Sequence, residues 1–151
     1  IASCLVGSEM CIRDRYKSIL LAADGSENSL RSAKEVLNFI DDNTIVTILT
    51  VVDVEESKTD VLHGKQSSSL TNEREDKLSH ITELFVEHNV KYEMKIAHGV
   101  PADTVVSVAN SGEFQAIVLG TRGLNSLQEM VLGSVSHKVA KRSEIPVVIV
   151  K

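Results

Sequence analysis

The stretch Ala116-Ile-Val-Leu-Gly-Thr-Arg-Gly123, followed after nine residues by Gly133-Ser134, decides the fold of this chain. An apolar run leads into a loop punctuated by glycine, and a helical pattern then begins at Ser134, a residue type that caps helices well. Glycine lets the backbone approach an anion closely and adopt positive φ angles, and the N–H groups that open a helix favour negative charge. The spacing predicts either a phosphate-binding loop or a turn followed by a helix cap, and by itself it leaves both open.

Strand-like segments recur on both sides of this stretch. Short apolar runs predict buried strands, and an alternation of apolar and charged residues predicts one half-buried strand that contains Tyr92, Met94 and Ile96. The five predicted strands span residues 18–23, 44–52, 91–96, 116–119 and 146–150.

Helical patterns fill the intervals between these strands, because apolar residues recur there at spacings of three and four. Ser26 can cap the first helix, Pro101 suits the first position of the third, and the polar, serine-rich residues 53–69 predict a loop. The predicted buried faces consist of Leu30, Ala33, Val36, Leu37 and Ile40; of Leu78, Ile81, Leu84 and Phe85, in a helix extending back to Leu70; and of Ala102, Val105, Val106 and Ala109, with a last helix from Ser134 to about Ser143.

The alternation predicts a single α/β domain with a five-stranded, mainly parallel sheet and helices on both faces. Ligands of such sheets bind beyond the carboxyl ends of the strands, where the strand order reverses. Asp24 follows the first strand, residues 51–53 end the second, and Gly120 ends the fourth. We therefore expect these three segments to meet at one ligand-binding edge.

Composition excludes several classes of function. The chain has 151 residues, 42% of them apolar, and a formal net charge of −5, which argues against nucleic acid as a partner. No apolar run reaches the roughly 18 residues of a membrane span, so no membrane association is expected. Both cysteines, Cys4 and Cys11, lie in the first fifteen residues, and the cysteine-free remainder is compatible with a reducing cytoplasm.

The first fifteen residues form a separate segment without a helical or strand period. The piece Glu9-Met-Cys-Ile-Arg-Asp-Arg15 resembles the translation of a sequencing-library adapter, and we expect residues 1–15 to be a non-native leader. A genuine disordered extension is the alternative. In either case the predicted domain spans residues 16–151.

Four further motifs stand at the ends of predicted strands: Tyr16-Lys-Ser-Ile-Leu-Leu-Ala-Ala-Asp-Gly-Ser26, Thr50-Val-Val-Asp53, His98-Gly-Val-Pro101 and Pro146-Val-Val-Ile-Val150. Together with Gly120-x2-Gly123-x9-Gly133-Ser134 they resemble the universal stress protein family over residues 16–151. The resemblance implies a Rossmann-like fold. The glycine spacing resembles the nucleotide-binding signature of the family and is complete, which places the chain with the members that bind ATP.

The resemblance also implies a role for each position of the site. The adenosine is held near Asp24, whose carboxylate contacts the ribose or a phosphate-bound metal, and the backbone of Val51 contacts the edge of the adenine. Arg122 pairs with a phosphate or faces solvent. The remaining positions are Ala22 and Ala23 beside the adenosine; Leu119, Gly120 and Gly123 along the ribose and triphosphate; and Gly133, Ser134, Val135 and Ser136 as donors to the phosphates.

Several of these residues also have a purely structural interpretation. Asp24 can simply cap its turn, and Ser134 and Ser136 can be helix caps rather than phosphoacceptors. The apolar residues within 127–132 suit core packing first and a partner surface second. The five histidines share no metal-ligand spacing, so the metal ligands, if any, stay unknown.

Three functions follow from the sequence. The first is a small ATP-binding domain, with Mg²⁺, that acts as a stress sensor or regulator through a cytoplasmic homodimer formed by the last strand, from Pro146 to Val150. The second is an ATP hydrolase or self-phosphorylating protein. Its turnover should be slow, because the glycine loop lacks the lysine of a GKS/T phosphate loop. The third is a nucleotide-free interaction module that keeps its glycines for folding. Bound nucleotide separates the first from the third, and turnover separates the first from the second.

Overall fold

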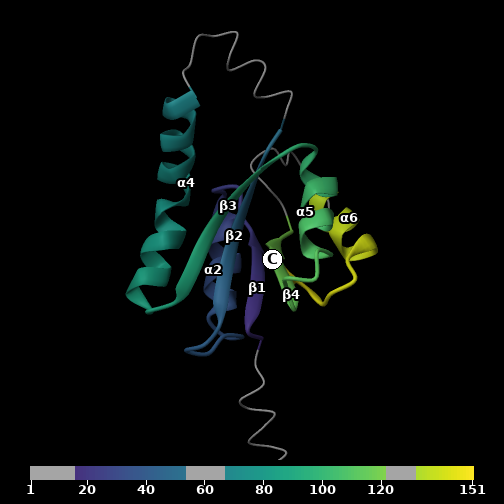
Figure 1. Ribbon diagram of the computed structural model, residues 1–151, viewed down its shortest axis with the longest axis horizontal. Coiled ribbons are helices and arrows are strands. Elements are labelled where there is room, and N and C mark those ends of the chain that lie inside the picture. Colours follow the sequence, from purple (N-terminus) through teal and green to yellow (C-terminus); the bar gives the residue numbers. More distant parts are fainter. Residues whose placement is uncertain (1–15, 54–66, 122–131) are drawn as a thin grey trace, which may run out of the picture.

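The computed structural model describes residues 16–53, 67–121 and 132–151. Its centre is a five-stranded sheet with the strand order β3-β2-β1-β4-β5 (Figure 1). All four pairs of neighbouring strands are parallel, which confirms the predicted fold class. The strands are β1 (Ser18–Ala22), β2 (Ile45–Val52), β3 (Lys91–His98), β4 (Ala116–Gly120) and β5 (Val147–Val150).

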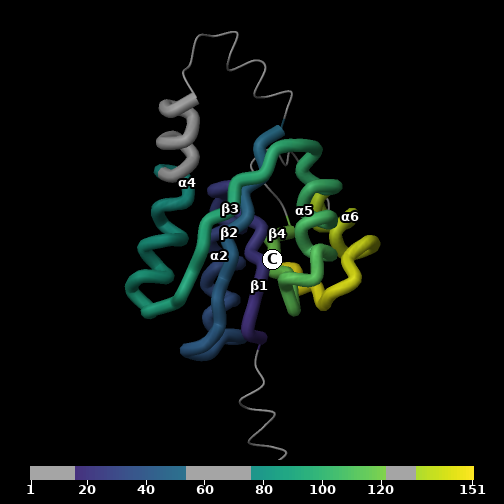
Figure 2. Tube along the Cα trace, in the orientation of Figure 1, coloured from purple at the N-terminus to yellow at the C-terminus, as the bar shows by residue number. Residues whose placement is uncertain are grey.

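In the described part of the chain, four helices connect these strands, and the pairs α2–α4 and α5–α6 cover opposite faces of the sheet (Figures 1 and 2). Within the described ranges, no helix is both long and apolar enough to cross a bilayer. The helices are α2 (Glu27–Val36), α4 (Ser67–Glu87), α5 (Pro101–Ala109) and α6 (Ser134–Arg142).

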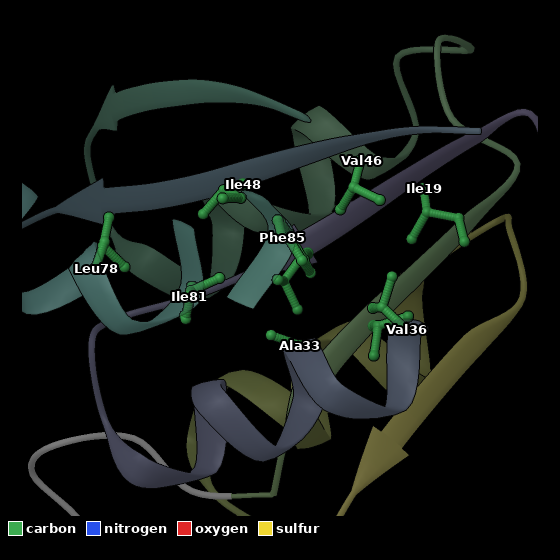
Figure 3. Packing of buried hydrophobic residues seen from close by; sticks show 11 residues of the cluster. Ile19, Ala33, Val36, Val46, Ile48, Leu78, Ile81 and Phe85 are labelled. Atoms are coloured by element: carbon green, nitrogen blue, oxygen red, sulfur yellow. The ribbon is translucent and has the colours of Figure 1, made fainter. Parts of the chain in front are cut away.

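The hydrophobic core has two halves because successive strand residues point to opposite faces of the sheet. On one face, the apolar residues of β1 and β2 pack against α2 and α4, where Phe85 is fully buried (Figure 3). On the other face, Leu20 and Leu49 pack with residues of α5 and α6. The central strands β1, β2 and β4 are thus apolar on both sides, as their near-continuous apolar runs predict.

Local sequence signals fix where two helices begin. The hydroxyl of Ser26 accepts a hydrogen bond of 3.2 Å from the N–H of Ser29 and caps α2, as predicted. Pro101 occupies the first turn of α5, where its missing N–H costs nothing.

Four expectations need correction. α4 begins at Ser67, so residues 67–69 are helical rather than loop. α2 ends at Val36, and Leu37 and Ile40 pack against the core from the turns that follow. On β3, Met94 and Ile96 are 40% and 42% exposed, because this strand lies at the edge of the sheet. On the helices, Leu30, Leu84 and Val106 are only partly buried. The predicted leader, residues 1–15, lies outside the described residues.

Candidate functional site

The candidate site lies where the carboxyl ends of β1 and β4 meet. The chain passes from β1 outward to β2 and β3 and then returns to the other side of β1 with β4 and β5. Ala22 therefore pairs with Leu49 on one side and with Leu119 on the other. This register confirms that the ends of strands one, two and four share an edge, which is the switch point where ligands of such sheets bind.

Asp24 turns the chain from β1 into α2. Its Oδ1 accepts hydrogen bonds from the N–H of Ser26 at 2.9 Å and from the hydroxyl of Ser29 at 3.0 Å. The next residue, Gly25, has φ +79°, and a Cβ there would lie 2.7 Å from the Cβ of Lys77 in α4. The carboxylate thus makes the hydrogen bonds that stabilise the turn, as its structural interpretation predicts. The same bonds fix the direction of the carboxylate at the switch point.

The ladder between β1 and β2 ends just before Val51. The N–H of Ala23 donates to the carbonyl of Leu49 at 2.9 Å, and the buried hydroxyl of Thr50 donates to the carbonyl of Ala23 at 3.0 Å. Backbone groups of alternate strand residues point to opposite neighbours, so the N–H and C=O of Val51, like those of Leu49, face the β1 side. Because β1 ends at Ala22, these two groups point past its carboxyl end, on the side of the switch point.

Gly120 is explained by packing as well as by any ligand. Its φ is not positive. A Cβ at this position would lie 2.9 Å from the Cβ of Asn28 and 3.2 Å from the backbone carbon and oxygen of the same residue. The absent side chain therefore allows the first turn of α2 to approach the end of β4 closely.

Thr121 joins the end of β4 to the start of α6. Its N–H donates to the carbonyl of Val150 at 2.9 Å, and its carbonyl accepts from the N–H of Gly133 at 2.6 Å and from the hydroxyl of Ser136 at 3.0 Å. Thr121 is buried, and sequence reasoning gave it no role. Its position inside the quoted glycine motif was the available signal.

The start of α6 differs from the prediction in one respect. The N-cap is Gly133, with φ −72° and ψ 168°, and Ser134 is the exposed first helical residue, so Ser134 is not the cap. Ser136 is buried and also lies 3.0 Å from the carbonyl of Gly133. A helix provides no carbonyl four residues back for the N–H groups of Ser134, Val135 and Ser136, so these groups can serve an anion.

Charges along α6 suit an anion at its N-terminus. The first turn has no acidic residue, whereas the last turn contains Lys141 and Arg142. Negative charge is stabilised at a helix N-terminus and positive charge at its C-terminus. The first turns of α2 and α5 differ, since they contain Glu27 and Asp103.

Polar contacts fix α6 to α5. The Nζ of Lys138 lies 2.8 Å and 2.9 Å from the two carboxylate oxygens of Asp103, and a guanidinium nitrogen of Arg142 lies 3.2 Å from one of them. The hydrogen bond from Lys138, together with the attraction of both cations, lowers the pKa of Asp103. Asn110 accepts from the N–H of Glu144 and donates to the carbonyl of Arg142. These contacts hold the middle and the C-terminal end of α6, and the contacts to Thr121 hold its N-terminal end.

Two predicted site residues, Arg122 and Gly123, lie outside the described residues, as do residues 127–131 of the apolar segment. Leu119 and Ala22 are described and pack into the core on the α5–α6 face. Among the described residues, no group of three or more His, Cys, Asp or Glu side chains could hold a metal ion.

These features define a class of protein: a doubly wound α/β domain whose switch point brings together an oriented carboxylate, the end of a strand and a helix N-terminus. The model of the universal stress protein family matches residues 15–151, and the chain belongs to this family.

Individual relatives agree with this assignment. The chain is 33% identical over 140 residues to universal stress protein MJ0531 of Methanocaldococcus jannaschii, covering 90% of this chain and 82% of the relative. The solved structure of MJ0577, from the same organism, superposes with a TM-score of 0.77 at 30% identity, over 91% of this chain and 96% of that chain. A universal stress protein solved in complex with cAMP superposes with a TM-score of 0.70 at 21% identity, over 91% and 99% of the two chains, which shows the shared fold.

Proposed function

We propose that this protein binds an adenine nucleotide, ATP with Mg²⁺, at the switch point and acts as a nucleotide-dependent regulator. The observation that supports this most is that the α6 N-terminus, the Asp24 carboxylate and the backbone of Val51 near the end of β2 lie at one edge of the sheet. A structural neighbour with the same fold binds cAMP, an adenine nucleotide.

Each part of the site has a distinct task in this proposal. The N–H and C=O of Val51 are a donor and an acceptor on one strand end, which matches the paired polar edge of adenine. Asp24 accepts hydrogen bonds from the ribose hydroxyls or contacts the metal. The N–H groups of residues 134–136 bind phosphate oxygens, and Arg122 and Gly123 complete the site.

The described residues fit Mg²⁺ that arrives with the nucleotide. Mg²⁺ keeps several waters and takes one or two carboxylates together with substrate phosphates, so it does not need a preformed cluster of acidic residues. Asp24 is the carboxylate at the switch point that would face it. When bound, the ion neutralises phosphate charge.

The proposed output is a change of surface or assembly that another protein detects in the cytoplasm under stress. A ligand shifts such an equilibrium by its differential affinity for the two states. The proposed homodimer forms through β5, an apolar strand at the edge of the sheet whose burial removes an aggregation-prone edge.

The decisive experiment measures nucleotide in and on the purified protein. Protein prepared without added nucleotide is denatured and the released small molecules are analysed, and nucleotide-free protein is then titrated with ATP–Mg²⁺, AMP and cAMP by calorimetry. We expect bound adenine nucleotide or a clear affinity for ATP–Mg²⁺. A nucleotide-free protein that binds none of the three would refute the proposal.

Two variants of Asp24 separate its charge from its turn. Asp24→Asn keeps an acceptor oxygen for Ser26 and Ser29, whereas Asp24→Ala removes it. If the carboxylate contacts the nucleotide, both variants weaken binding by roughly 1–3 kcal/mol. If Asp24 only forms the turn, Asp24→Asn binds like wild type.

Gly133→Val tests the phosphate end of the site. The φ of −72° at Gly133 suits valine, and the chain already has a valine, Val100, as the N-cap of α5 with φ −70°. We expect a folded variant that no longer binds ATP, because the branched side chain blocks the phosphate path. Val100→Gly is the matched control and retains binding. Unchanged affinity in folded Gly133→Val would overturn the assignment of this loop.

One observation favours the alternative of a nucleotide-free interaction module. The N–H of Gly133 and the hydroxyl of Ser136 both donate to backbone carbonyls, and Gly120 accommodates Asn28. These contacts give the glycine motif a structural purpose without a ligand. The calorimetric titration decides between the two functions.

A further inference from the structure

β3 forms one edge of the sheet and offers backbone groups to a further strand. The N–H of Gly99 donates to the carbonyl of Val52 at 3.0 Å, so odd-numbered residues of this segment face β2. Backbone groups alternate in direction along a strand. The N–H and C=O of Tyr92, Met94 and Ile96 therefore point away from β2, beyond the edge of the sheet. Among the described strands, none pairs with this outer side of β3.

The side chains of β3 combine exposed apolar groups with alternating charges. Met94 and Ile96 are 40% and 42% exposed on the face of the sheet that Tyr92 shares. The opposite face has Lys91, Glu93 and Lys95 in alternation. Lysine on an edge strand normally discourages pairing, so only a partner with a matching charge pattern is suitable.

We propose that β3 pairs antiparallel with β3 of a second copy of this chain, about a two-fold axis that passes midway between Met94 and its counterpart in the second copy. This register places each Glu93 opposite Lys95 of the second copy. It also places Met94 opposite its own counterpart. Tyr92 lies opposite Ile96 of the second copy, so the residues with outward-pointing backbone groups face one another and bury the exposed apolar side chains.

The charges select this register over its neighbours. An axis through Glu93 would place Glu93 opposite its own counterpart and Lys91 opposite Lys95. An axis through Lys95 would place two copies of Lys95 together. Like charges directly opposite one another destabilise a strand pair, and opposite charges stabilise it. Lys95 also lies 3.6 Å from Glu113 of its own chain, at an exposed position where a second carboxylate can approach.

This contact is distinct from the homodimer proposed through β5, because the two strands lie at opposite edges of the sheet. Both two-fold axes would cross the same sheet, one at each edge, and would therefore be nearly parallel. Two parallel two-fold axes combine into a translation rather than a closed ring, so together the contacts would join copies in a row and extend the sheet from copy to copy. The inference rests on β3 alone and holds whether or not nucleotide binds or β5 pairs.

Proline at outward-pointing positions separates the two edges. Met94→Pro removes an outward N–H from β3 without removing a bond to β2, and proline is tolerated on edge strands in this orientation. Ile149→Pro does the same on β5, since the carbonyl of Val150 binds Thr121 and Ile149 therefore faces outward. Masses of wild type, both single variants and the double variant are measured by analytical ultracentrifugation over a range of concentrations.

We expect species larger than a dimer for wild type at high concentration if both edges pair, and a dimer for Ile149→Pro that Met94→Pro abolishes in the double variant. A monomeric Ile149→Pro protein, or identical masses with and without Met94→Pro, overturns the β3 contact. Circular dichroism and thermal melts establish that each variant is folded.

Charge exchange tests the register without proline. In the Ile149→Pro background, Glu93→Lys or Lys95→Glu alone places like charges opposite each other twice, and we expect each to weaken association by about tenfold or more. The double change Glu93→Lys with Lys95→Glu restores both pairs and should restore association. Glu113→Gln is the matched control, because it removes only the contact of Lys95 within its own chain. The register is refuted if both single changes associate as strongly as the Ile149→Pro background, or if the double change does not restore association.

Discussion

Replacement of Gly120 by alanine should destabilise the protein even when no nucleotide is present. The new methyl carbon would lie 2.9 Å from the Cβ of Asn28 and 3.2 Å from the backbone carbon and oxygen of the same residue. A flexible side chain could move aside, but here most of the contact is with the backbone of α2, so the helix itself must shift. Overpacking of this kind costs about 1–3 kcal/mol.

Urea unfolding of nucleotide-free wild type and Gly120→Ala measures this cost directly. Asn28→Gly removes the carbon that lies closest to the new methyl group. In a double-mutant cycle, Gly120→Ala should therefore lower the unfolding free energy by at least about 0.5 kcal/mol less in the Asn28→Gly background than in wild type. If nucleotide-free Gly120→Ala is as stable as wild type and loses only its affinity for ATP, the packing explanation is wrong and Gly120 serves the ligand alone.

Three further predictions concern the core and the anchors of α6. Phe85→Ala should lower the unfolding free energy by about 3–5 kcal/mol, measured by urea unfolding, because the ring is fully buried; a loss below 1 kcal/mol would contradict the packing of α4. Ser136→Ala should cost about 0.5–1.5 kcal/mol in the same assay, since the carbonyl of Thr121 keeps its bond from Gly133, and a cost of several kcal/mol would show that the hydroxyl does more. The lowered pKa of Asp103 means that its ion pairs stabilise the fold above the ordinary pKa of the carboxyl group and lose this effect as the pH falls through the folded-state value. The stability difference between wild type and Asp103→Asn should therefore be largest near neutral pH and disappear in strong acid, and a difference independent of pH would contradict this origin.

Periodicity predicted the sheet and its helices because each helix buries one continuous apolar face and the central strands bury both of theirs. Ile19 and Leu21 point to α2 and α4, and Leu20 points to α5 and α6, so an unbroken apolar run was the correct signal for a strand covered on both sides. β3 shows the limit of such reasoning. Its alternation indicated half-burial, but its place at the edge of the sheet, which no local pattern records, leaves Met94 and Ile96 exposed.

The candidate site was predictable where a residue makes its contacts through its side chain, and less predictable where it makes them through its backbone. Asp24, Gly25 and Ser26 form the expected turn and cap. Thr121 escaped notice because its carbonyl, which any residue has, makes the contacts to Gly133 and Ser136. The helix begins at Ser134 as predicted, but Ser134 was wrongly taken as its N-cap because serine is a better capping residue than glycine. The N-cap is instead Gly133, whose N–H donates to the carbonyl of Thr121.

The two described glycines of the motif are therefore unequal tests of nucleotide binding. Gly120 is required by the approach of α2, so loss of binding in a Gly120 variant confounds a displaced helix with a blocked site. Gly133 has a backbone conformation open to any residue, and a valine serves as the corresponding cap of α5. The backbone angles at Gly133 therefore do not require glycine. The response of Gly133→Val is thus the more direct measure of whether a phosphate occupies this edge of the sheet.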